Sequence, residues 1–391
     1  MQVVRSVSFF RKDVTMLQVK NAHVYTPKDQ GIQDVWIAGG KIEAVSKTLP
    51  LIDGIDCIDA TGKILTPGLI DRHVHITGGG GEGGFCTQAP AVTASRLIRG
   101  GLTTVVGLLG TDGITRSVEA LVAKAKALKE QGISAYCMTG AYGYPSPTIT
   151  DSVQKDIVFI EEIIGCKLAL SDHRSSHVTL EELMRLASDV RVAGMLSKKA
   201  GILTLHLGDE KQGLQTVMDI LDQTDIPIKT FQPTHVNRNP FLLQQAIGFA
   251  NRGGTIDITC DSGEGVYQAL MKIKEDGVCI DRVTLSSDGQ GSWSKYDAQG
   301  NFLQIGVSDV DTIYKQIVYL VQQKNWSLEE ALALGCCNVA KALELYPKKG
   351  VIQEGSDADL LLWNQDLCLD TVIAQGHILM KDGKLQIHEM L

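Results

Sequence analysis

The sequence lacks two features that would define whole classes of protein. No apolar run approaches the roughly 18 consecutive residues that a membrane-spanning helix requires, and the 45 acidic residues outnumber the 37 Lys and Arg residues, which gives a net charge of -8. Proteins that grip nucleic acid need an excess of positive charge to meet the phosphates. We therefore expect neither a membrane nor nucleic acid as a partner.

The cysteines also lack the spacing that is typical of a disulfide framework or a zinc ribbon. The nine cysteines form an odd set with no Cys-x-x-Cys motif, which is typical of reduced thiols in a cytosolic protein. Residues 1–15 contain Phe9 and Phe10 but no long apolar segment or cleavage site, so we expect no secretory signal. We predict a cytoplasmic location and an N-terminal tail over residues 1–15, with a cloning remnant or an extra edge strand equally open.

What remains is an ordinary globular composition. The 391 residues include 44% hydrophobic residues, 21% charged residues and 40 glycines. These values argue against a disordered chain, a collagen or a coiled coil. The length allows one large domain and one smaller domain, with an ample core.

Both ends of the chain have the pattern of short β-strands. Between residues 16 and 65, alternating apolar residues are punctuated by turn signals such as Gly39-Gly40 and Thr61-Gly62. Residues 350–391 repeat this texture, for example in the apolar run Leu360–Trp363 after Gly355-Ser356-Asp357. We predict one small β-sandwich domain built from both chain ends.

The middle of the chain, residues 66–349, alternates strands and helices with a period of roughly 30 to 40 residues, the signature of βα units in a parallel sheet. Eight strands are expected, at Ile64–Ile76, Thr103–Leu109, Ile133–Thr139, Cys166–Leu170, Ile202–Leu207, Ile228–Val236, Thr255–Cys260 and Arg282–Ser287. Helices are expected among them at Ser117–Gln131, Gln154–Ile164, Leu180–Lys199, Leu214–Gln223, Pro240–Asn251 and Val266–Asp276. This count predicts an α/β protein with a (β/α)8 TIM barrel, and an open doubly wound sheet is the alternative.

Four of the nine histidines and one aspartate stand where predicted barrel strands end. His73 and His75 end the first strand, while His206, His235 and Asp288 end the fifth, sixth and eighth. Because a TIM barrel carries its chemistry at the carboxyl ends of its strands, these side chains are expected to meet. Clustered histidines with a carboxylate are typical metal ligands, so the sequence predicts a metal site.

Each of these residues also has a plainer interpretation. His73-Val74-His75 alone is compatible with two core histidines, because such short motifs often occur by chance. Asp288 precedes Gly289 and is compatible with a turn cap. Lys167, within the fourth strand, is compatible with a lysine paired to a barrel carboxylate.

With these residues in place, the sequence resembles the amidohydrolase superfamily, whose barrel carries His-x-His after strand 1, Lys on strand 4, His on strands 5 and 6, and Asp on strand 8. The resemblance spans nearly the whole chain. Within the superfamily, the chain resembles the β-aspartyl (isoaspartyl) dipeptidase family in the segments Gly78–Gly84, Gly110–Gly113, Thr139–Tyr142, Lys167–Arg174, Pro233–Arg238 and Ser287–Ser292.

The resemblance implies two divalent metal ions per subunit, with zinc as the expected metal. It places His73, His75 and Asp288 on one ion and His206 and His235 on the other. Lys167 would bridge them as a carbamate, since a partly buried lysine beside cations favours the neutral amine that takes up carbon dioxide. A metal-bridging hydroxide would attack the substrate carbonyl, and Asp288 would shuttle the proton as general base and then acid.

Side chains on the predicted βα loops indicate a charged substrate. Glu82, in a glycine-rich loop, is suited to an amino group, and the forked guanidinium groups of Arg174 and Arg238 suit carboxylates. A solvated loop glutamate and surface salt bridges remain the alternatives. The resemblance assigns Glu82 to the free amino group and both arginines to carboxylates.

Three further loop residues are candidates for substrate binding. Tyr142 is expected to donate its phenolic hydrogen to the developing oxyanion, or else to make an aromatic lid contact. Thr111 and Ser292 are expected to hydrogen-bond the substrate, or else to cap helices.

These assignments predict a binuclear-metal dipeptidase that cleaves the isopeptide bond of β-aspartyl dipeptides, which are small zwitterions. One alternative is an amidohydrolase acting on a cyclic amide, of the dihydroorotase or hydantoinase type, although a neutral ring needs no ammonium partner such as Glu82. The other is a non-enzymatic amidohydrolase-like scaffold, which would be expected to lose ligands. The resemblance also implies a symmetric homo-oligomer, such as an octamer.

Overall fold

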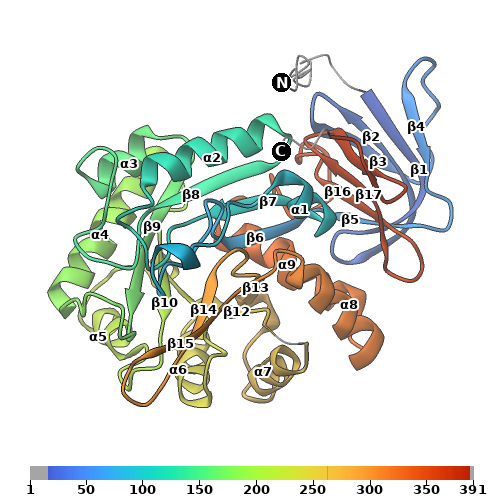
Figure 1. Cartoon of the computed structure of the whole chain (residues 1–391). Coiled ribbons are helices and arrows are strands. Elements are labelled where there is room, and N and C mark those ends of the chain that lie inside the picture. The colour runs from blue at the N-terminus through green and yellow to red at the C-terminus, as the bar shows by residue number, and fades with distance from the viewer. Residues whose placement is uncertain (1–15, 262, 388–391) are drawn as a thin grey trace.

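The computed structural model describes residues 16–261 and 263–387, so the predicted tail at residues 1–15 lies outside the described residues. A barrel of parallel strands surrounded by helices adjoins a β-rich part in which blue and red strands, from opposite ends of the chain, lie together (Figure 1). The predicted TIM barrel with a small β-sandwich from both chain ends is confirmed.

The β-sandwich is one nine-stranded mixed sheet in the order β19-β18-β17-β16-β5-β1-β2-β3, with β4 paired to β1. Its strands are β1 (Met16–Tyr25), β2 (Asp29–Ala38), β3 (Lys41–Ser46), β4 (Asp56–Asp59), β5 (Ile64–Pro67), β16 (Leu360–Trp363), β17 (Leu369–Ala374), β18 (His377–Lys381) and β19 (Lys384–Leu385). The antiparallel β5–β16 pair joins the two chain ends, with Leu65 opposite Leu362. Both leucines are buried in a core that belongs to the sandwich itself.

The barrel strands are β6 (Leu69–Val74), β7 (Leu102–Gly107), β8 (Ser134–Gly140), β9 (Ile163–Leu170), β10 (Ile202–Leu207), β11 (Phe231–Thr234), β12 (Ile256–Thr259) and β13 (Val283–Ser286). Six of them, β6 to β11, form a continuous sheet, and β12 and β13 pair with each other. The ring is completed by two hydrogen bonds, from the amide of Val236 to the carbonyl of Asp257 and from the amide of His75 to the carbonyl of Gly289.

Helices flank the barrel strands and cover the sheet. They are α1 (Ala94–Arg99), α2 (Val118–Glu130), α3 (Val153–Phe159), α4 (Leu180–Ser197), α5 (Gln215–Gln223), α6 (Pro240–Asn251), α7 (Gly263–Glu275), α8 (Thr312–Lys324), α9 (Leu328–Gly335) and α10 (Cys337–Ala342). Short 3-10 turns lie at Phe85–Thr87, Ile228–Thr230 and Ile280–Arg282, and a hairpin, β14 (Ser292–Tyr296) and β15 (Phe302–Val307), follows the last barrel strand.

The predicted single strand Ile64–Ile76 is wrong, because the chain changes sheets at Gly68. The Gly68 amide donates to the Asp359 carbonyl in the sandwich, and the next amide, of Leu69, donates to the Gly101 carbonyl in the barrel. A Cβ atom at Gly68 would lie 2.1 Å from the hydroxyl oxygen of Thr103. Glycine therefore allows the two sheets to meet this closely. We keep residues 16–65, 66–349 and 350–391 as the proposed division into domains, with β5 reaching across the first boundary.

Two other predicted elements need correction. The helix expected over Gln154–Ile164 ends at Phe159, and Ile163 and Ile164 begin β9, in keeping with the preference of β-branched residues for strands. The strand expected from Ile228 begins only at Phe231. Residues 228–230 form a 3-10 turn, because the Thr230 amide donates to the carbonyl of Pro227.

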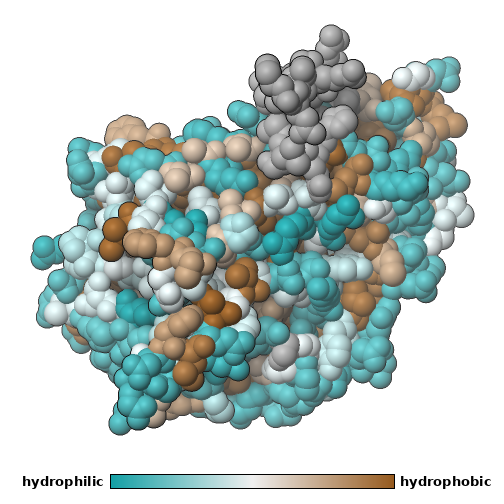
Figure 2. All heavy atoms as spheres, viewed as in Figure 1, coloured by the Kyte–Doolittle hydropathy of each residue, from teal (hydrophilic) through white to brown (hydrophobic). Residues whose placement is uncertain are grey.

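Among the described residues, no helix is long and apolar enough to cross a membrane. In the view of Figure 2, hydrophilic residues cover most of the visible face and hydrophobic residues appear in smaller groups.

Candidate active site

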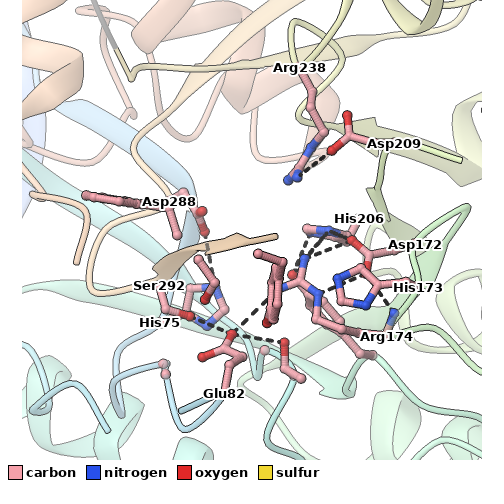
Figure 3. Close-up of a pocket in the computed structure, with 18 of the residues that line it drawn as sticks. His75, Glu82, Asp172, His173, Arg174, His206, Asp209, Arg238, Asp288 and Ser292 are labelled. Carbon is pink, nitrogen blue, oxygen red and sulfur yellow. Dashed lines mark hydrogen bonds and ion pairs between the residues drawn. The ribbon is translucent and has the colours of Figure 1, made fainter. Parts of the chain in front are cut away.

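A cavity of about 330 Å³ opens at the carboxyl ends of the barrel strands (Figure 3). Nine of the residues predicted from the sequence line it: His75, Glu82, Thr111, Tyr142, Arg174, His206, Arg238, Asp288 and Ser292. The other predicted ligands, His73, Lys167 and His235, are buried and reach the same place from β6, β9 and the residue after β11. The barrel therefore brings all of the predicted site residues into one region.

Asp288 is the point on which the histidines converge. Its Oδ1 atom lies 3.1 Å from Nε2 of His75 and 3.4 Å from Nε2 of His73. His73, His235 and Asp288 form a group whose potential ligand atoms lie within 4.8 Å of one another. The ring centroid of His235 lies 4.8 Å from that of His73 and 4.6 Å from that of His206. His235 was assigned together with His206 to one metal ion, yet it lies about as close to His73, a predicted ligand of the other ion.

Burial sets the protonation of these imidazoles. Desolvation lowers the pKa values of His73, His206 and His235 well below their usual value of 6.5. Lys167 reinforces the shift at His73, whereas Asp288 opposes it at His235 and Asp172 opposes it at His206. These three rings are therefore neutral at physiological pH, which is the form that binds metal ions.

The Asp288 carboxyl is ionised at neutral pH. Burial alone would raise its pKa, but the hydrogen bond with His75 and the nearby His235 and Lys167 outweigh burial and lower the pKa to about 2. Asp288 and His235 also both adopt left-handed backbone conformations, with φ of 52° and 61°. Such conformations are costly for residues other than glycine and cluster at functional sites.

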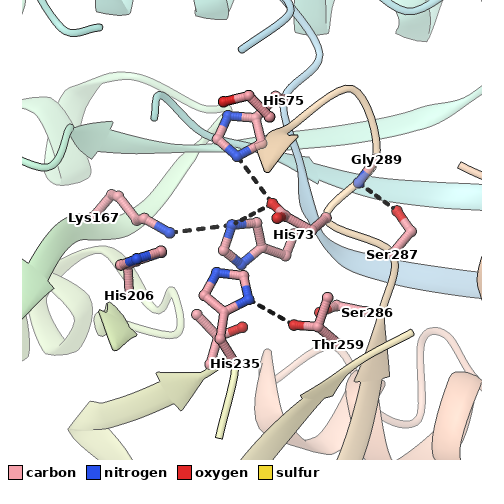
Figure 4. Close-up of polar contacts among 12 residues, drawn as sticks. His73, His75, Lys167, His206, His235, Thr259, Ser286, Ser287 and Gly289 are labelled. Carbon is pink, nitrogen blue, oxygen red and sulfur yellow. Dashed lines mark hydrogen bonds and ion pairs between the residues drawn. The ribbon is translucent and has the colours of Figure 1, made fainter. Parts of the chain in front are cut away.

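Lys167 extends from β9 into the same cluster, with its Nζ atom 3.1 Å from Nε2 of His73 (Figure 4). Desolvation lowers the pKa of Lys167 to about 7, although Asp288 and Asp257 oppose the shift. A substantial share of the amine is therefore unprotonated near neutral pH, and an unprotonated amine is a nucleophile.

The donor set fits divalent metal ions. Neutral imidazoles, an ionised carboxylate and a readily deprotonated lysine come together, and this mixture of nitrogen and oxygen donors suits zinc. Nδ1 of His73 and Nδ1 of His75 are buried without a hydrogen-bond partner among the described residues. By contrast, Nδ1 of His235 lies 2.6 Å from the hydroxyl of Thr259, so its orientation is fixed by a neighbour, as is common for metal-binding histidines.

Glu82 lies close to Arg174 and Ser292 in the cavity (Figure 3). Its Oε1 atom accepts hydrogen bonds from Ser292 Oγ at 2.7 Å and Thr111 Oγ1 at 3.3 Å, and lies 3.5 Å from Nη1 of Arg174. Its Oε2 atom is buried without a hydrogen-bond partner among the described residues. A buried carboxylate oxygen with spare acceptor capacity is suited to a cationic ligand.

The two predicted arginines differ in how firmly they are held. Arg174 forms a two-pronged ion pair with Asp172, with Nε–Oδ1 and Nη2–Oδ2 distances of 2.8 Å. Arg238 lies 3.7 Å from Asp209, whose side chain is 67% exposed. A long contact to an exposed carboxylate is weak, so Arg238 is free to exchange Asp209 for another anion.

Tyr142 follows β8 and lines the cavity. Its hydroxyl lies 2.6 Å from Nδ1 of His206, and the Arg174 guanidinium lies 5.3 Å from the centre of its ring. Burial raises the pKa of Tyr142 well above 10, so the phenol stays protonated and is a hydrogen-bond donor.

Comparison with known proteins agrees with this geometry. The chain is similar to a crystal structure of a β-aspartyl dipeptidase from Fervidobacterium islandicum AW-1 in complex with the β-Asp-Leu dipeptide, with 44% sequence identity and a TM-score of 0.92, covering 96% of this chain and 100% of that one. A model of the amidohydrolase family matches residues 247–379. The chain belongs to the amidohydrolase family. Both the resemblance inferred from the sequence and the prediction of a hydrolase are confirmed.

More distant relatives of this amidohydrolase have other names. An L-hydantoinase from Paenarthrobacter aurescens is 24% identical over 91% of this chain and 86% of its own length. Adenine deaminase 2 from Rhizobium johnstonii is 34% identical over 90% of this chain, which spans about half (54%) of that protein.

Sequence reasoning missed several residues that line the amidohydrolase cavity, namely Asp172, His173, Asp209, Glu210, Trp293, Ser294 and Tyr296. Trp293, Ser294 and Tyr296 belong to the hairpin strand β14, which the strand prediction did not include. Asp172 lies between Lys167 and Arg174, and its position after a ligand-bearing strand was the signal that could have identified it.

Proposed function

We propose that this amidohydrolase cleaves the isopeptide bond of β-aspartyl dipeptides and releases aspartate and an amino acid. The observation that carries the proposal is the pairing of Glu82 with Arg174, 3.5 Å apart, in the cavity that also holds His75 and Asp288. A carboxylate and a guanidinium side by side in one cavity suit a substrate with both an ammonium and a carboxylate group. The likeness to a dipeptidase bound to β-Asp-Leu supports the same substrate class.

The charges of a β-aspartyl dipeptide match the cavity group by group. Such a dipeptide has one free ammonium and two carboxylates. Glu82 offers an unpartnered buried oxygen to the ammonium, and Arg174 and Arg238 offer guanidinium groups to the carboxylates. Arg238 has only a long contact to Asp209, so binding a substrate carboxylate costs it little.

We propose that two divalent ions, with zinc as the expected metal, are held by His73, His75, His206, His235 and Asp288, with Lys167 as a carbamate between them. The neutral state of three of these histidines supports this ligand set, and so does the lowered pKa of Lys167. Such ions would supply an activated water near neutral pH and would polarise the carbonyl under attack.

The chain's own residues would move the protons. Asp288, ionised and exposed to the cavity, accepts the proton of the attacking water and passes it to the leaving amine as the C–N bond breaks. Tyr142 stays protonated and donates its hydroxyl hydrogen to the negative charge that forms on the carbonyl oxygen. One proton thus travels from water to amine, and no other reactant is needed.

Cyclic amides are the competing substrates, since the chain is also similar to an L-hydantoinase. The buried Glu82 counts against them, because a neutral ring has no ammonium group to pair with it. A scaffold without catalytic activity is disfavoured because every predicted ligand is present in the cluster.

A substrate panel tests the proposal. The zinc-loaded protein is assayed with β-Asp-Leu, α-Asp-Leu, dihydroorotate and hydantoin, and we expect hydrolysis of β-Asp-Leu alone or by a wide margin. Hydrolysis of a cyclic amide without action on β-Asp-Leu would overturn the assignment. Inactivity on all four together with no metal bound after growth in zinc-replete medium would favour the scaffold.

A further inference from the structure

Asp172, just after β9, has no role in the reaction proposed above, yet its carboxylate is fully engaged. Its side chain is 3% exposed. Oδ1 accepts hydrogen bonds from Nε and the backbone amide of Arg174 at 2.8 and 2.9 Å, and Oδ2 accepts from Nη2 of Arg174 at 2.8 Å. Oδ2 also lies 3.0 Å from Nε2 of His206. One buried carboxylate therefore contacts both a substrate-binding residue and a candidate metal ligand.

The contact with Arg174 fixes the direction of the guanidinium. The two-pronged pair uses Nε and Nη2, so Nη1 is the nitrogen left to face Glu82, 3.5 Å away. The Tyr142 ring packs against the same guanidinium. Because a two-pronged pair restricts rotation as well as position, Asp172 aims the free edge of Arg174 into the cavity.

The contact with His206 fixes which ring nitrogen carries the proton. An aspartate already paired with an arginine is ionised and can only accept hydrogen bonds. His206 must therefore carry its hydrogen on Nε2, which leaves a lone pair on Nδ1. Nδ1 lies nearer the Tyr142 hydroxyl, at 2.6 Å, than Nε2 does, at 3.3 Å. Nε2 also lies 3.5 Å from Nη2 of Arg174, a longer contact than its 3.0 Å contact with Asp172. A carboxylate behind a histidine in this manner is the common means of orienting a metal ligand.

The backbone is shaped to place this carboxylate. Ser171 adopts a left-handed conformation with φ of 53° at the end of β9. Gly208, which follows β10, leaves the space that residues 171 and 172 fill, since a Cβ atom there would lie 2.4 Å from the Ser171 carbonyl oxygen and 2.5 Å from the Asp172 Cβ. Asp172 is thus clamped between the ends of two neighbouring barrel strands.

We propose that Asp172 is a positioning residue that serves both halves of the site, by aiming Arg174 at a substrate carboxylate and by presenting Nδ1 of His206 to a metal ion. The inference rests on the proposed function for the role of Arg174. It goes beyond that function because it makes both the affinity for metal and the affinity for substrate depend on the Asp172 carboxylate.

The test compares Asp172→Asn with Arg174→Lys and with the surface control Asp222→Asn, whose carboxylate pairs with Arg252 on the exterior. Zinc affinity is measured on metal-free protein by competition with a chromophoric chelator, and KM and kcat are measured with β-Asp-Leu. Asp172→Asn should weaken zinc binding by about 10- to 100-fold and raise KM by about tenfold or more. Arg174→Lys should raise KM and leave zinc affinity unchanged, and Asp222→Asn should change neither.

A double variant and a displacement variant sharpen the result. In Asp172→Asn/Arg174→Lys, the increase in KM should be smaller than the product of the single increases, because both changes disable the same guanidinium. If Asp172→Asn fails to fold, Asp172→Glu keeps the charge but moves the carboxylate by one methylene, and it should weaken both zinc and substrate binding.

Wild-type zinc affinity or wild-type KM in the folded Asp172→Asn protein would overturn the inference. So would a loss of zinc affinity of equal size in Arg174→Lys. Failure of the proposed function would give a different result, namely a wild-type protein that does not hydrolyse β-Asp-Leu. In that case the zinc affinities would still test whether Asp172 positions His206.

Discussion

The Nζ atom of Lys167 lies 3.1 Å from Nε2 of His73, in the most buried part of the site, where neither side chain is more than 1% exposed. Burial against a neutral imidazole disfavours the charged form of this lysine, although Asp288 and Asp257 oppose the shift of its pKa. This relationship makes Lys167 the residue whose chemistry most directly tests the metal centre.

Replacing Lys167 by alanine should lower kcat on β-Asp-Leu by at least about 100-fold, because a ligand between the two ions is lost. Metal content measured by elemental analysis should fall below two ions per chain. Lys155, on the outer helix α3, offers a matched control, and Lys155→Ala should keep both metal and activity. A Lys167→Ala protein with two metals and full activity would exclude the bridge.

Carbon dioxide should be required to rebuild the site. If the unprotonated amine of Lys167 forms a carbamate, metal-free protein given zinc in carbon-dioxide-depleted buffer should recover less activity than the same protein given zinc and bicarbonate. The two samples are compared at equal pH and zinc concentration. Equal recovery in both would count against the carbamate while leaving the histidine ligands untouched.

Changing Glu82 to glutamine should act mainly on substrate binding. The variant keeps the shape of the side chain but loses the charge that meets the ammonium, so KM for β-Asp-Leu should rise by about 10- to 100-fold, since a hydrogen bond to a charged group contributes about 1.5–3 kcal/mol. The kcat value should fall much less. Glu161→Gln, at an 81% exposed surface ion pair, is the control. A fall in kcat with unchanged KM would place Glu82 in the chemical step instead.

Asp288→Asn should abolish proton transfer while keeping the volume of the side chain. Steady-state kinetics with β-Asp-Leu should show kcat reduced by about 10²- to 10⁴-fold, the usual effect of losing a general acid–base group. Asp297→Asn, in the loop between β14 and β15, should leave kcat unchanged. An Asp288→Asn enzyme that retains both its metals and its kcat would remove the proton shuttle from the mechanism.

Lys349 should be essential for stability rather than for activity. It is 2% exposed and pairs with Asp357 and Asp359 while donating to Ser134 Oγ at 2.9 Å, which ties the sandwich to the start of β8. Lys349→Met leaves the buried Asp359 without its lysine partner and leaves Asp357 with Lys41 alone. The change should lower the free energy of unfolding by about 3–5 kcal/mol in urea titrations at pH 7. The exposed neighbour variant Lys348→Met should change it by less than about 0.5 kcal/mol.

The same destabilisation should shrink as the pH falls from 7 to 5. Burial alone would raise the pKa of Asp357, but Lys349 and Lys41 lower it below 3.8. In the wild-type protein the ion pair between Asp357 and Lys349 therefore keeps its contribution to the free energy of unfolding between pH 7 and pH 5. This contribution is lost only as the pH falls through the lowered pKa. In Lys349→Met, Asp357 keeps Lys41 but loses Lys349. Its carboxyl therefore takes up a proton at a higher pH, which relieves its buried charge. If the difference in unfolding free energy between the wild-type protein and Lys349→Met grew toward pH 5, this explanation would be contradicted.

Much of the fold was predictable because its signals are local. The alternation of apolar strands and helices sets the barrel, and the ligands His73, His206 and His235 could be located because parallel strands end on one rim. The strand Ile64–Ile76 was not predictable as two pieces, because its break at Gly68 depends on contact with Thr103, on another strand. A steric contact between residues on different strands produces no periodic pattern in the sequence.

The residues of the candidate site were likewise predictable only in part. Glu82, Arg174 and Arg238 were identifiable by their charge and by their position after ligand-bearing strands. Asp172 was passed over although it stands two residues before Arg174, because what marks it is the meeting of two loops. The hairpin residues Trp293 and Tyr296 reach the cavity only through the fold of β14 against β15.

The pairing of β5 with β16 has a consequence for how the protein is made. Trp363 donates its indole hydrogen to Thr66 across 297 residues of chain. At a synthesis rate of roughly 5 to 20 residues per second, β5 waits roughly 15 to 60 s for its partner to leave the ribosome. Through that interval β5 presents an unpaired edge, with which the strand of another chain could pair.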